Sequence, residues 1–184
     1  MVEIDGYLPR KLGLTKDGLR AAAEFFAAKS SARIGVSFRA VTVILQDDAF
    51  SAEVHEAING AKGPTDVITQ RYDAMPGEPE GVYGELYVNV DQALRVAPKR
   101  RDWSPARELL LYVAHGMDHL SGADDLKPRD YDRMRRRELR WLKDFQRCEG
   151  GCVRKGQLRS DFVIIPAKRV KGGQYGDIKH NCEL

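Results

Sequence analysis

The sequence predicts one α+β domain, in which a mixed β-sheet of about four strands packs with about five helices. Two observations lead to this prediction. The chain of 184 residues is long enough for one domain with a full core and too short for two comfortable ones. Segments rich in β-branched residues also alternate along the chain with segments of helical periodicity. A content of 42% hydrophobic and 31% charged residues fits an ordinary globular protein.

The first half of the chain predicts two helices and two strands. Residues 17–29 (DGLRAAAEFFAAK) are alanine-rich with apolar residues at helical spacing, which predicts a helix. Residues 34–46 alternate and then become continuously β-branched, so they predict a strand. Ser51 is suited to cap a short helix over residues 51–59. After a Gly-Pro break, residues 65–72 predict a second strand.

The second half begins with a loop over residues 75–81, which hold two prolines and two glycines. Residues 83–90 (YGELYVNV) alternate as a third strand, and a helix is expected over residues 91–97. Ser104 caps a better-marked helix, because a proline and then an acidic first turn follow it. A last amphipathic helix is predicted over residues 127–147. Its apolar side consists of Tyr131, Met134, Trp141, Leu142 and Phe145.

Charge divides the chain into a domain of residues 1–149 and a basic C-terminal tail of residues 150–184. The net charge is +3, and the tail carries seven Lys/Arg against three Asp/Glu. This glycine-rich tail is where we most expect disorder, although residues 163–165 (VII) fit a small fourth strand. A second basic density lies in the helix at 127–147. Basic runs can attract the phosphates of nucleic acids, but a solvated helix face is the commoner explanation.

Composition also argues against some classes of protein. No apolar run approaches the ~18 residues of a membrane helix, so we expect no membrane partner. The N-terminus lacks the apolar stretch of a secretion signal. Three cysteines are too few for a disulfide framework and favour a reducing cytoplasm. Either these are unrelated thiols, or they form a second zinc site from Cys148, Cys152, His180 and Cys182.

The segment LYVAHGMDHLSGADD at 111–125 carries the strongest sign of chemistry. His115 and His119 lie four residues apart, so on a helix they stack on one face and can point toward one ion. Gly122 suits the left-handed turn after a helix end. That reversal can bring Asp124 or Asp125 back to the two imidazoles. The alternative is an ordinary helix end with hydrogen-bonded core histidines.

Two histidines and one carboxylate leave a coordination position open for water, as catalytic zinc sites do. The ion would lower the pKa of that water toward ~7. A metalloprotease-like hydrolase would need a glutamate directly after the first histidine, but Gly116 stands there. A non-haem iron oxygenase uses the same three ligand types, usually on the strands of a barrel.

Three motifs, in the same order along the chain, resemble the YbeY family of metal-dependent endoribonucleases, which are linked to ribosomal RNA maturation. HGMDHLSGADD resembles the family signature HGxLHLxGYDH. GPTDVIT at 63–69 resembles the family's PTDVLSF strand, and GELYVNVDQA at 84–93 resembles its GDIxIS strand. The resemblance covers about residues 35–147. It implies a zinc-dependent endoribonuclease specific for single-stranded RNA, acting on ribosomal RNA and the small ribosomal subunit in the cytoplasm.

The resemblance also assigns the metal ligands. His115 and His119 match the first two ligands of one Zn²⁺ per chain. Asp125 stands where the family usually has a third histidine, which adds a negative charge and makes the bound water less acidic. Asp118 replaces an apolar residue of the signature, a change that the sequence does not explain.

Other departures concern catalysis and RNA binding. The family places an arginine upstream of the PTDV strand, and here HEAINGAKGPTD contains none, so Lys62 or Arg71 is the candidate for a positive charge. Glu85 replaces the aspartate of the GDI motif and is the candidate for orienting water, unless it is an ordinary strand residue. Lys168 and Arg169 of the tail are further RNA-binding candidates. Because of the missing arginine, a ribosome-associated RNA-binding factor that keeps the metal but cleaves poorly is the alternative function.

Overall fold

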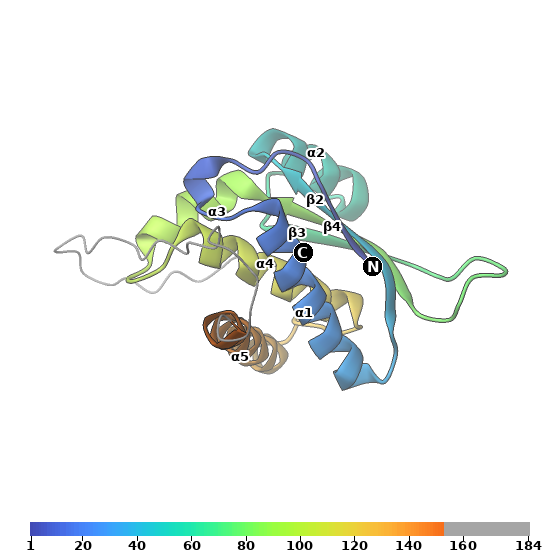
Figure 1. The fold of residues 1–184 in the computed structure, drawn as a ribbon. Helices are drawn as coiled ribbons and strands as arrows, with labels where there is room; N and C mark the ends of the chain where they lie inside the picture. The colour runs from blue at the N-terminus through green and yellow to red at the C-terminus, as the bar shows by residue number, and fades with distance from the viewer. Residues whose placement is uncertain (153–184) are drawn as a thin grey trace.

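The computed structural model describes the backbone of residues 1–152 and the side chains of residues 1–148 (Figure 1). Within this part, five α-helices and a four-stranded sheet confirm the predicted α+β fold. The elements are β1 (Val2–Asp5), η1 (Arg10–Leu12), α1 (Lys16–Ile34), β2 (Phe38–Gln46), α2 (Asp48–Asn59), β3 (Val67–Tyr72), β4 (Val82–Asn89), α3 (Val90–Val96), η2 (Ala97–Lys99), α4 (Pro105–Leu120) and α5 (Pro128–Cys152).

The sheet is mixed, as predicted, with the strand order β1-β2-β4-β3. β1 and β4 both run parallel to β2, whereas β3 runs antiparallel to β4. The three parallel strands therefore end at the same edge of the sheet. β1 was not predicted, because four residues are too few to show a period. The strand expected at 163–165 lies outside the described residues.

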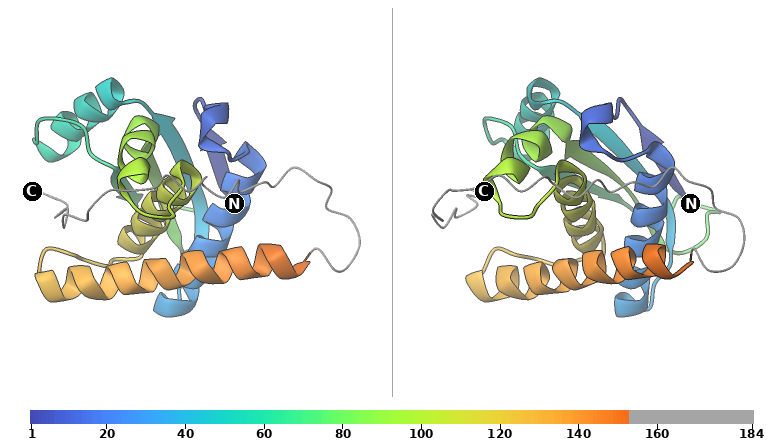
Figure 2. Two further views of the ribbon diagram at one scale, coloured as in Figure 1. Left: turned by 90° about the vertical axis from the view of Figure 1, so that its left-hand side faces the viewer. Right: turned by 60° about the vertical axis from the view of Figure 1, so that its left-hand side comes forward.

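The helices α1 and α4 pack together on one face of the sheet, and α5 lies across both of them (Figures 1 and 2). Alternation along the strands places apolar side chains under these helices. The buried residues of this face include Val41, Val43, Leu45, Leu86 and Val88. In the part of the chain that the structure describes, every helix is too short or too polar to cross a membrane.

The boundary between the first helix and the first predicted strand differs from the prediction. Residues 17–29 are helical, but α1 continues to Ile34, where the strand was expected to begin. Gly35 ends the helix with a φ of 70°, a left-handed conformation that favours glycine. β2 therefore begins only at Phe38. Ile34 has the β-branched side chain typical of strands, but its packing against the core keeps it helical.

The predicted cap of α2 is also wrong. Asp47 caps this helix by accepting a hydrogen bond from the Phe50 amide at 2.9 Å, so the helix begins four residues earlier. Ser51 is buried inside the first turn instead. Its hydroxyl donates to the Thr65 carbonyl at 3.1 Å, and the Thr65 amide donates to it at 3.2 Å. Ser51 thus ties α2 to the segment before β3.

The other predicted elements lie where the sequence places them. β3, β4 and α3 agree with the predicted ranges to within two residues. Residues 75–81 lie outside helices and strands, as expected. The Ser104 hydroxyl accepts a hydrogen bond from the Arg107 amide at 3.2 Å and caps α4. α5 covers nearly all of 127–147 and buries the predicted apolar side chains, of which Tyr131 is half-buried.

Candidate metal centre

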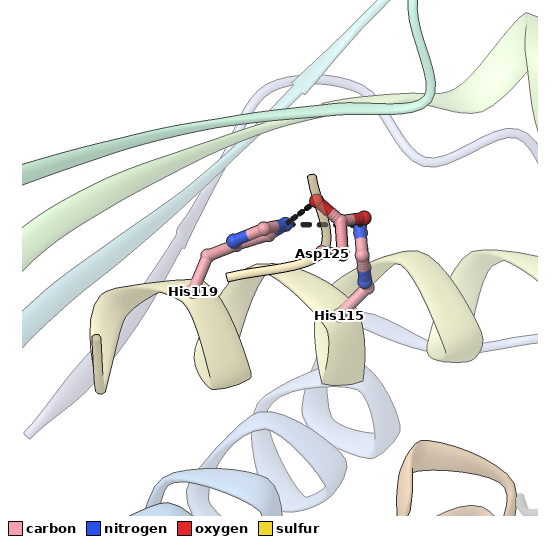
Figure 3. Close-up of side chains that lie close together, drawn as sticks. All are labelled: His115, His119 and Asp125. Atoms are coloured by element: carbon pink, nitrogen blue, oxygen red, sulfur yellow. Dashed lines mark hydrogen bonds and ion pairs between the residues drawn. The ribbon is translucent and has the colours of Figure 1, made fainter. Parts of the chain in front are cut away.

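The last two turns of α4 bring His115 and His119 together. Spacing by four residues stacks the side chains on one helix face. The Nε2 atoms of the two rings lie 3.1 Å apart, and the ring centroids lie 4.4 Å apart (Figure 3). His115 is 5% exposed, whereas His119 is half-buried and nearer to solvent. One side of the pair is therefore open to a water molecule or a substrate.

The turn after α4 supplies the third side chain of the group, as the sequence predicted. Gly122 has a φ of 80°, and its amide donates to the His119 carbonyl at 2.8 Å. The chain reverses there and returns Asp125 to the imidazoles (Figure 3). Its carboxylate oxygens lie 3.6 Å from His115 Nε2 and 3.8 Å from His119 Nε2. Ligand atoms from all three residues fall within 4.8 Å of one another. This group could hold a metal ion.

The hydrogen bonds on the outer side of each ring fit a metal site. His115 Nδ1 lies 2.6 Å from Glu138 Oε1, and His119 Nδ1 lies 3.0 Å from the Ala123 carbonyl oxygen. Both partners only accept, so each Nδ1 carries the proton and each Nε2 of a neutral ring presents a lone pair. Two lone pairs that face each other at 3.1 Å need a proton or a cation between them. An acceptor behind each ring is how proteins orient histidine ligands.

Electrostatics distinguish the two histidines. Burial alone lowers the pKa of His115, but the hydrogen bond to Glu138 and the charge of Glu138 outweigh it, so this pKa is raised. The charges of Asp66 and Arg135 also act on His115, in opposite directions. For His119, burial and the neighbouring His115 lower the pKa, although Asp125 opposes them. A positive charge is thus favoured at the Glu138 side of the group.

Glu138 is a residue of this site that the sequence reading did not identify. Its side chain is fully buried, and it also forms an ion pair with Arg135 Nη1 at 3.3 Å. A signal for it exists in the sequence. Glu138 falls between Met134 and Trp141 on the apolar side of α5, where an unpaired carboxylate would be costly. A charge on the buried stripe of a helix therefore indicates a partner on another element.

The structure explains Asp118, which the sequence did not. The side chain is fully buried, and Arg137 Nε of α5 donates to it at 2.7 Å. Arg33 of α1 lies 3.3 Å from its other oxygen. Burial raises the pKa of Asp118, and Arg137 offsets part of that rise. Asp118, the residue directly before His119, therefore links α4 to α1 and to α5.

The geometry argues against the metalloprotease alternative. A Cβ atom at Gly116 would lie 2.7 Å from Leu86 and 3.1 Å from Val67, both on the sheet. A side chain at this position would point into the packed helix–sheet interface and not toward the two histidines. The glutamate that such a hydrolase needs after its first histidine has no space here.

Glu85 does not join the group. A Cβ atom at the preceding Gly84 would meet Leu120 of α4 at 2.5 Å, and neighbouring strand residues point to opposite faces. Glu85 therefore lies on the face away from α4. Its carboxylate accepts hydrogen bonds from Tyr72 at 2.8 Å and Tyr87 at 2.7 Å. The hydrogen bond to Glu85 raises the pKa of Tyr87 to about 12.

The RNA-binding candidates lie in different places. Arg71 Nη1 donates to the Leu120 carbonyl at 3.1 Å, so this arginine lies at the end of α4. Lys62 is exposed in the loop before β3. Lys168 and Arg169 lie outside the described residues, as do three of the four side chains of the expected second zinc site, those of Cys152, His180 and Cys182. Asp124, the other carboxylate considered for the metal, is exposed and accepts from the Leu126 amide.

Three of the four arginines between positions 133 and 137 on α5 form ion pairs within the protein. Arg135 pairs with Glu138, Arg137 with Asp118, and Arg133 with Asp130 at 3.5 Å. The exposed Arg136 is the one of these four arginines that faces solvent without a described acidic partner. The run of arginines therefore fastens α5 to the domain more than it presents a continuous basic surface.

The fold and the site together define a class: an α+β protein with a two-histidine, one-carboxylate group at a helix end that can bind a divalent metal. A family model described as Endoribonuclease YbeY matches residues 12–146 of the chain. This match covers well over half of the sequence. The chain therefore belongs to the YbeY endoribonuclease family.

Individual relatives agree with this assignment. Proteins named Endoribonuclease YbeY from Rhodopirellula baltica, Micrococcus luteus and Thermus thermophilus are 36%, 38% and 34% identical over 118, 113 and 112 residues. The matches cover 64%, 56% and 59% of this chain. They span 59% of the Rhodopirellula protein, 69% of the Micrococcus protein and 78% of the Thermus protein.

A solved structure shares the fold. The solution structure of TM1509 from Thermotoga maritima superposes with a TM-score of 0.55 at 23% sequence identity. The superposition covers 83% of this chain and 93% of that protein. The likeness therefore extends over almost the whole of the described domain.

Proposed function

We propose that this protein is a metal-dependent endoribonuclease that cleaves single-stranded RNA. The family and the names of the relatives support the reaction class. The observation that carries the proposal is the pair of Nε2 atoms, 3.1 Å apart, whose Nδ1 atoms are both fixed by acceptors. An ion pair or a core packing role would not require both rings to present their lone pairs to one point.

His115, His119 and Asp125 would hold one zinc ion. Two imidazole nitrogens and a carboxylate are a common donor set for catalytic zinc, and three protein ligands leave a position for water. When bound, the ion acts as a Lewis acid toward that water and toward a phosphoryl oxygen of the RNA. Glu138 and the Ala123 carbonyl hold the protons on the Nδ1 atoms and so keep both Nε2 atoms free.

Arg135 is our candidate for the positive charge that the segment before β3 lacks. It lies beside the site through its ion pair with Glu138, and its side chain remains 20% exposed. A guanidinium there can stabilise negative charge that develops on a phosphate during cleavage. Arg71, at the end of α4, and Lys62 are candidates for contacts with flanking phosphates.

Ribosomal RNA within the small ribosomal subunit, in the cytoplasm, is the proposed target. The family resemblance and the basic C-terminal third support an RNA partner. The low cysteine content supports a reducing compartment. Lys168 and Arg169 of the C-terminal tail remain predicted RNA contacts.

A second candidate is an RNA-binding factor that holds the metal but cleaves poorly. One observation favours it: Glu85, the carboxylate expected to orient water, lies on the opposite face of the sheet and is bonded to two tyrosines. The two candidates differ in turnover and not in RNA affinity.

The test is an RNA-cleavage assay with zinc-loaded protein on matched single-stranded and duplex RNA. We expect cleavage of the single strand, its loss with EDTA and recovery on adding zinc. Asp125→Ala should lose cleavage, whereas Asp124→Ala, one residue away and outside the group, should retain it. Tight RNA binding without cleavage in the zinc-loaded protein would reject the endoribonuclease and support the RNA-binding factor.

A further inference from the structure

A pocket lies at the edge of the sheet where the three parallel strands end. Its volume is about 850 Å³, within the range of ligand sites in proteins. The segment after β1, the start of α2 and the start of α3 form its walls, and these elements lie together at one end of the sheet (Figure 1). We call it the sheet-end pocket; the residues that matter here are Tyr7, Arg10, Lys11, Gln46, Phe50 and Asp91.

Gln46 is the polar group of this pocket that the fold leaves unsatisfied. The residue is 5% exposed, and neither its Nε2 nor its Oε1 has a hydrogen-bond partner among the described residues. Burying an amide without partners costs free energy, so native proteins rarely do it without a ligand or a water. At Gln46 β2 is paired with Asn89 of β4, whereas its pairing with β1 ends at Ile44, and the side-chain amide is the donor and acceptor left without a partner.

The wall opposite Gln46 is built to approach it closely. Gly6 has a φ of 86°, and a Cβ atom there would lie 2.4 Å from the Leu45 carbonyl oxygen. Glycine therefore lets the chain after β1 cross the end of β2 at short range. That crossing places Tyr7, which is 78% exposed, at the mouth of the pocket, with Phe50, 46% exposed, at the start of α2. Two large aromatic side chains remain in solvent beside one opening.

Charge at the pocket is divided. Arg10 and Lys11 are exposed, and within residues 1–148 neither has an acidic partner at ion-pair distance. The acids are already used by the backbone. Asp47 caps α2 through the Phe50 amide, and Asp91 accepts from the Asp48 amide at 3.4 Å. Arg10 and Lys11 therefore bring two positive charges without an ion-pair partner to the mouth of the pocket, while the carboxylates of Asp47 and Asp91 are turned to the helix amides that they accept from.

We propose that the sheet-end pocket binds one nucleotide of a single-stranded RNA, with its base at Gln46 and its phosphate at Arg10 and Lys11. A side-chain amide offers a donor and an acceptor side by side, which matches the edge of a nucleobase. Exposed tyrosine and phenylalanine rings provide stacking surfaces for unpaired bases. A base in a duplex could not enter, so the pocket selects single strands.

This inference deepens the proposed endoribonuclease function and rests on it for the RNA. Asp66 connects the two places. Its carbonyl accepts from the Asn89 amide at 2.9 Å, next to the start of α3, and the following residue, Val67, lies 3.1 Å from where a Cβ atom of Gly116 would be, directly after His115. An RNA strand held at the pocket therefore has a short path along the PTDV segment to the histidines.

The experiment is a titration of ¹⁵N-labelled, zinc-loaded full-length protein followed by NMR. The probes are a short single-stranded 2′-O-methyl RNA, which resists cleavage, adenosine 5′-monophosphate, and inorganic phosphate. We expect the RNA to shift the Gln46 side-chain amide and the Phe50 backbone amide. Inorganic phosphate alone should leave the Gln46 amide unmoved. The absence of shifts at both residues with every nucleotide probe would overturn the proposal.

Variants make the test quantitative. Gln46→Met keeps the volume but removes both polar atoms, and should weaken RNA binding about tenfold. Gln70→Met, at a half-buried position of β3 outside the pocket, is the matched control, and its RNA affinity should stay within about twofold of the wild type. Tyr7→Ala, at an exposed position that does not threaten folding, should weaken binding by about fivefold or more. Equal affinities for Gln46→Met, Tyr7→Ala and the control would overturn the proposal.

The two proposals fail in different ways. If wild-type protein cleaves RNA but Gln46→Met shows unchanged affinity and KM, only the pocket assignment is wrong. If the pocket binds the 2′-O-methyl RNA but the zinc-loaded protein never cleaves, only the endoribonuclease is wrong. If adenosine 5′-monophosphate binds as tightly as the RNA, the RNA assignment is overturned and the pocket takes a free nucleotide.

Discussion

The helix-end site (His115, His119 and Asp125) and the sheet-end pocket differ in how completely their polar groups are bonded. At the helix end each imidazole has an acceptor behind it, and the neighbouring Asp118 is held by two arginines. At the sheet end the Gln46 amide has no partner among the described residues, and the aromatic side chains beside it are exposed.

This difference in hydrogen bonding matches the ligand that we assign to each place. Ligands for a metal must be held in fixed orientation before the ion arrives, because reorganisation would reduce its affinity. A pocket for an unpaired base gains from a polar group that remains free to bond the base and from rings that can move onto it. Buried hydrogen bonds orient the side chains of the helix-end site, whereas the polar group of the sheet-end pocket is left to bond a ligand.

The largest effect is expected from His119→Ala, which tests whether the helix-end site and the sheet-end pocket act independently. It removes one metal ligand, so we expect about 10³-fold slower RNA cleavage and loss of bound zinc. Nucleotide binding at the sheet-end pocket should not change, since no residue is shared. Metal analysis, cleavage rates and the NMR titration check this. His55→Ala, a histidine of α2 whose Nδ1 bonds the Gly63 carbonyl, is the control and should keep both zinc and cleavage.

The support beneath the helix-end site is tested by Arg137→Met. The substitution leaves Asp118 fully buried with Arg33 as its remaining partner, at 3.3 Å. We expect unfolding in urea, without metal, to lose about 3 kcal/mol of stability. Arg133→Met removes an exposed ion pair on the same helix and should cost at most about 1 kcal/mol. Equal losses of stability in the two variants would show that the buried ion pair of Asp118 contributes no more than an exposed one.

Glu138→Gln tests whether the helix-end site needs the negative charge behind His115 Nδ1. The amide oxygen can still accept from His115 Nδ1, but the negative charge that favours a cation is gone. We expect zinc affinity to fall about 10- to 100-fold in competition with a chromophoric chelator. Glu53→Gln, at an exposed position of α2, should leave it unchanged. An unaltered affinity in Glu138→Gln would mean that the carboxylate orients the ring without tuning the metal.

The smallest effect on cleavage is expected from Glu85→Gln. The carboxylate faces away from α4, so the cleavage rate should stay within about twofold. Replacing the carboxylate should instead lower the pKa of Tyr87 from about 12, because the hydrogen bond to Glu85 weakens and the phenolate is no longer repelled. Spectrophotometric titration of the tyrosines measures this shift, and Glu80→Gln is the exposed control. A cleavage loss of about 10²-fold would return Glu85 to a catalytic role.

The sequence predicted that the histidines of the helix-end site lie close together with an aspartate, because this geometry is local. Spacing by four on a helix, a glycine after the helix end and an acid three residues later place all three groups within eleven consecutive residues. These local rules left Asp124 and Asp125 as alternatives for the third side chain, and the resemblance to the family signature selected Asp125. The same local rules placed α4, Ser104 and the loop at 75–81.

What the sequence could not give depends on contacts between distant segments. Glu138 meets His115 across 23 residues, and Arg137 meets Asp118 across 19. The face that Glu85 occupies follows from how α4 packs on β4, which strand alternation alone does not decide. The sheet-end pocket joins residues near positions 7, 46 and 91, so no single stretch of sequence marks it.

The parallel pairing of β1 with β2 has a consequence for how the chain folds. Val2 lies opposite Val41, and Phe38 of β2 lies opposite Val82 of β4, so both pairings close loops of about 40 residues. The antiparallel hairpin of β3 and β4 closes a much shorter loop. Long loops are slow to close, so we expect the hairpin and α4 to assemble first and β1 to dock last. Amide protection against hydrogen exchange should then appear in Val67–Asn89 before it appears in Val2–Asp5 during refolding.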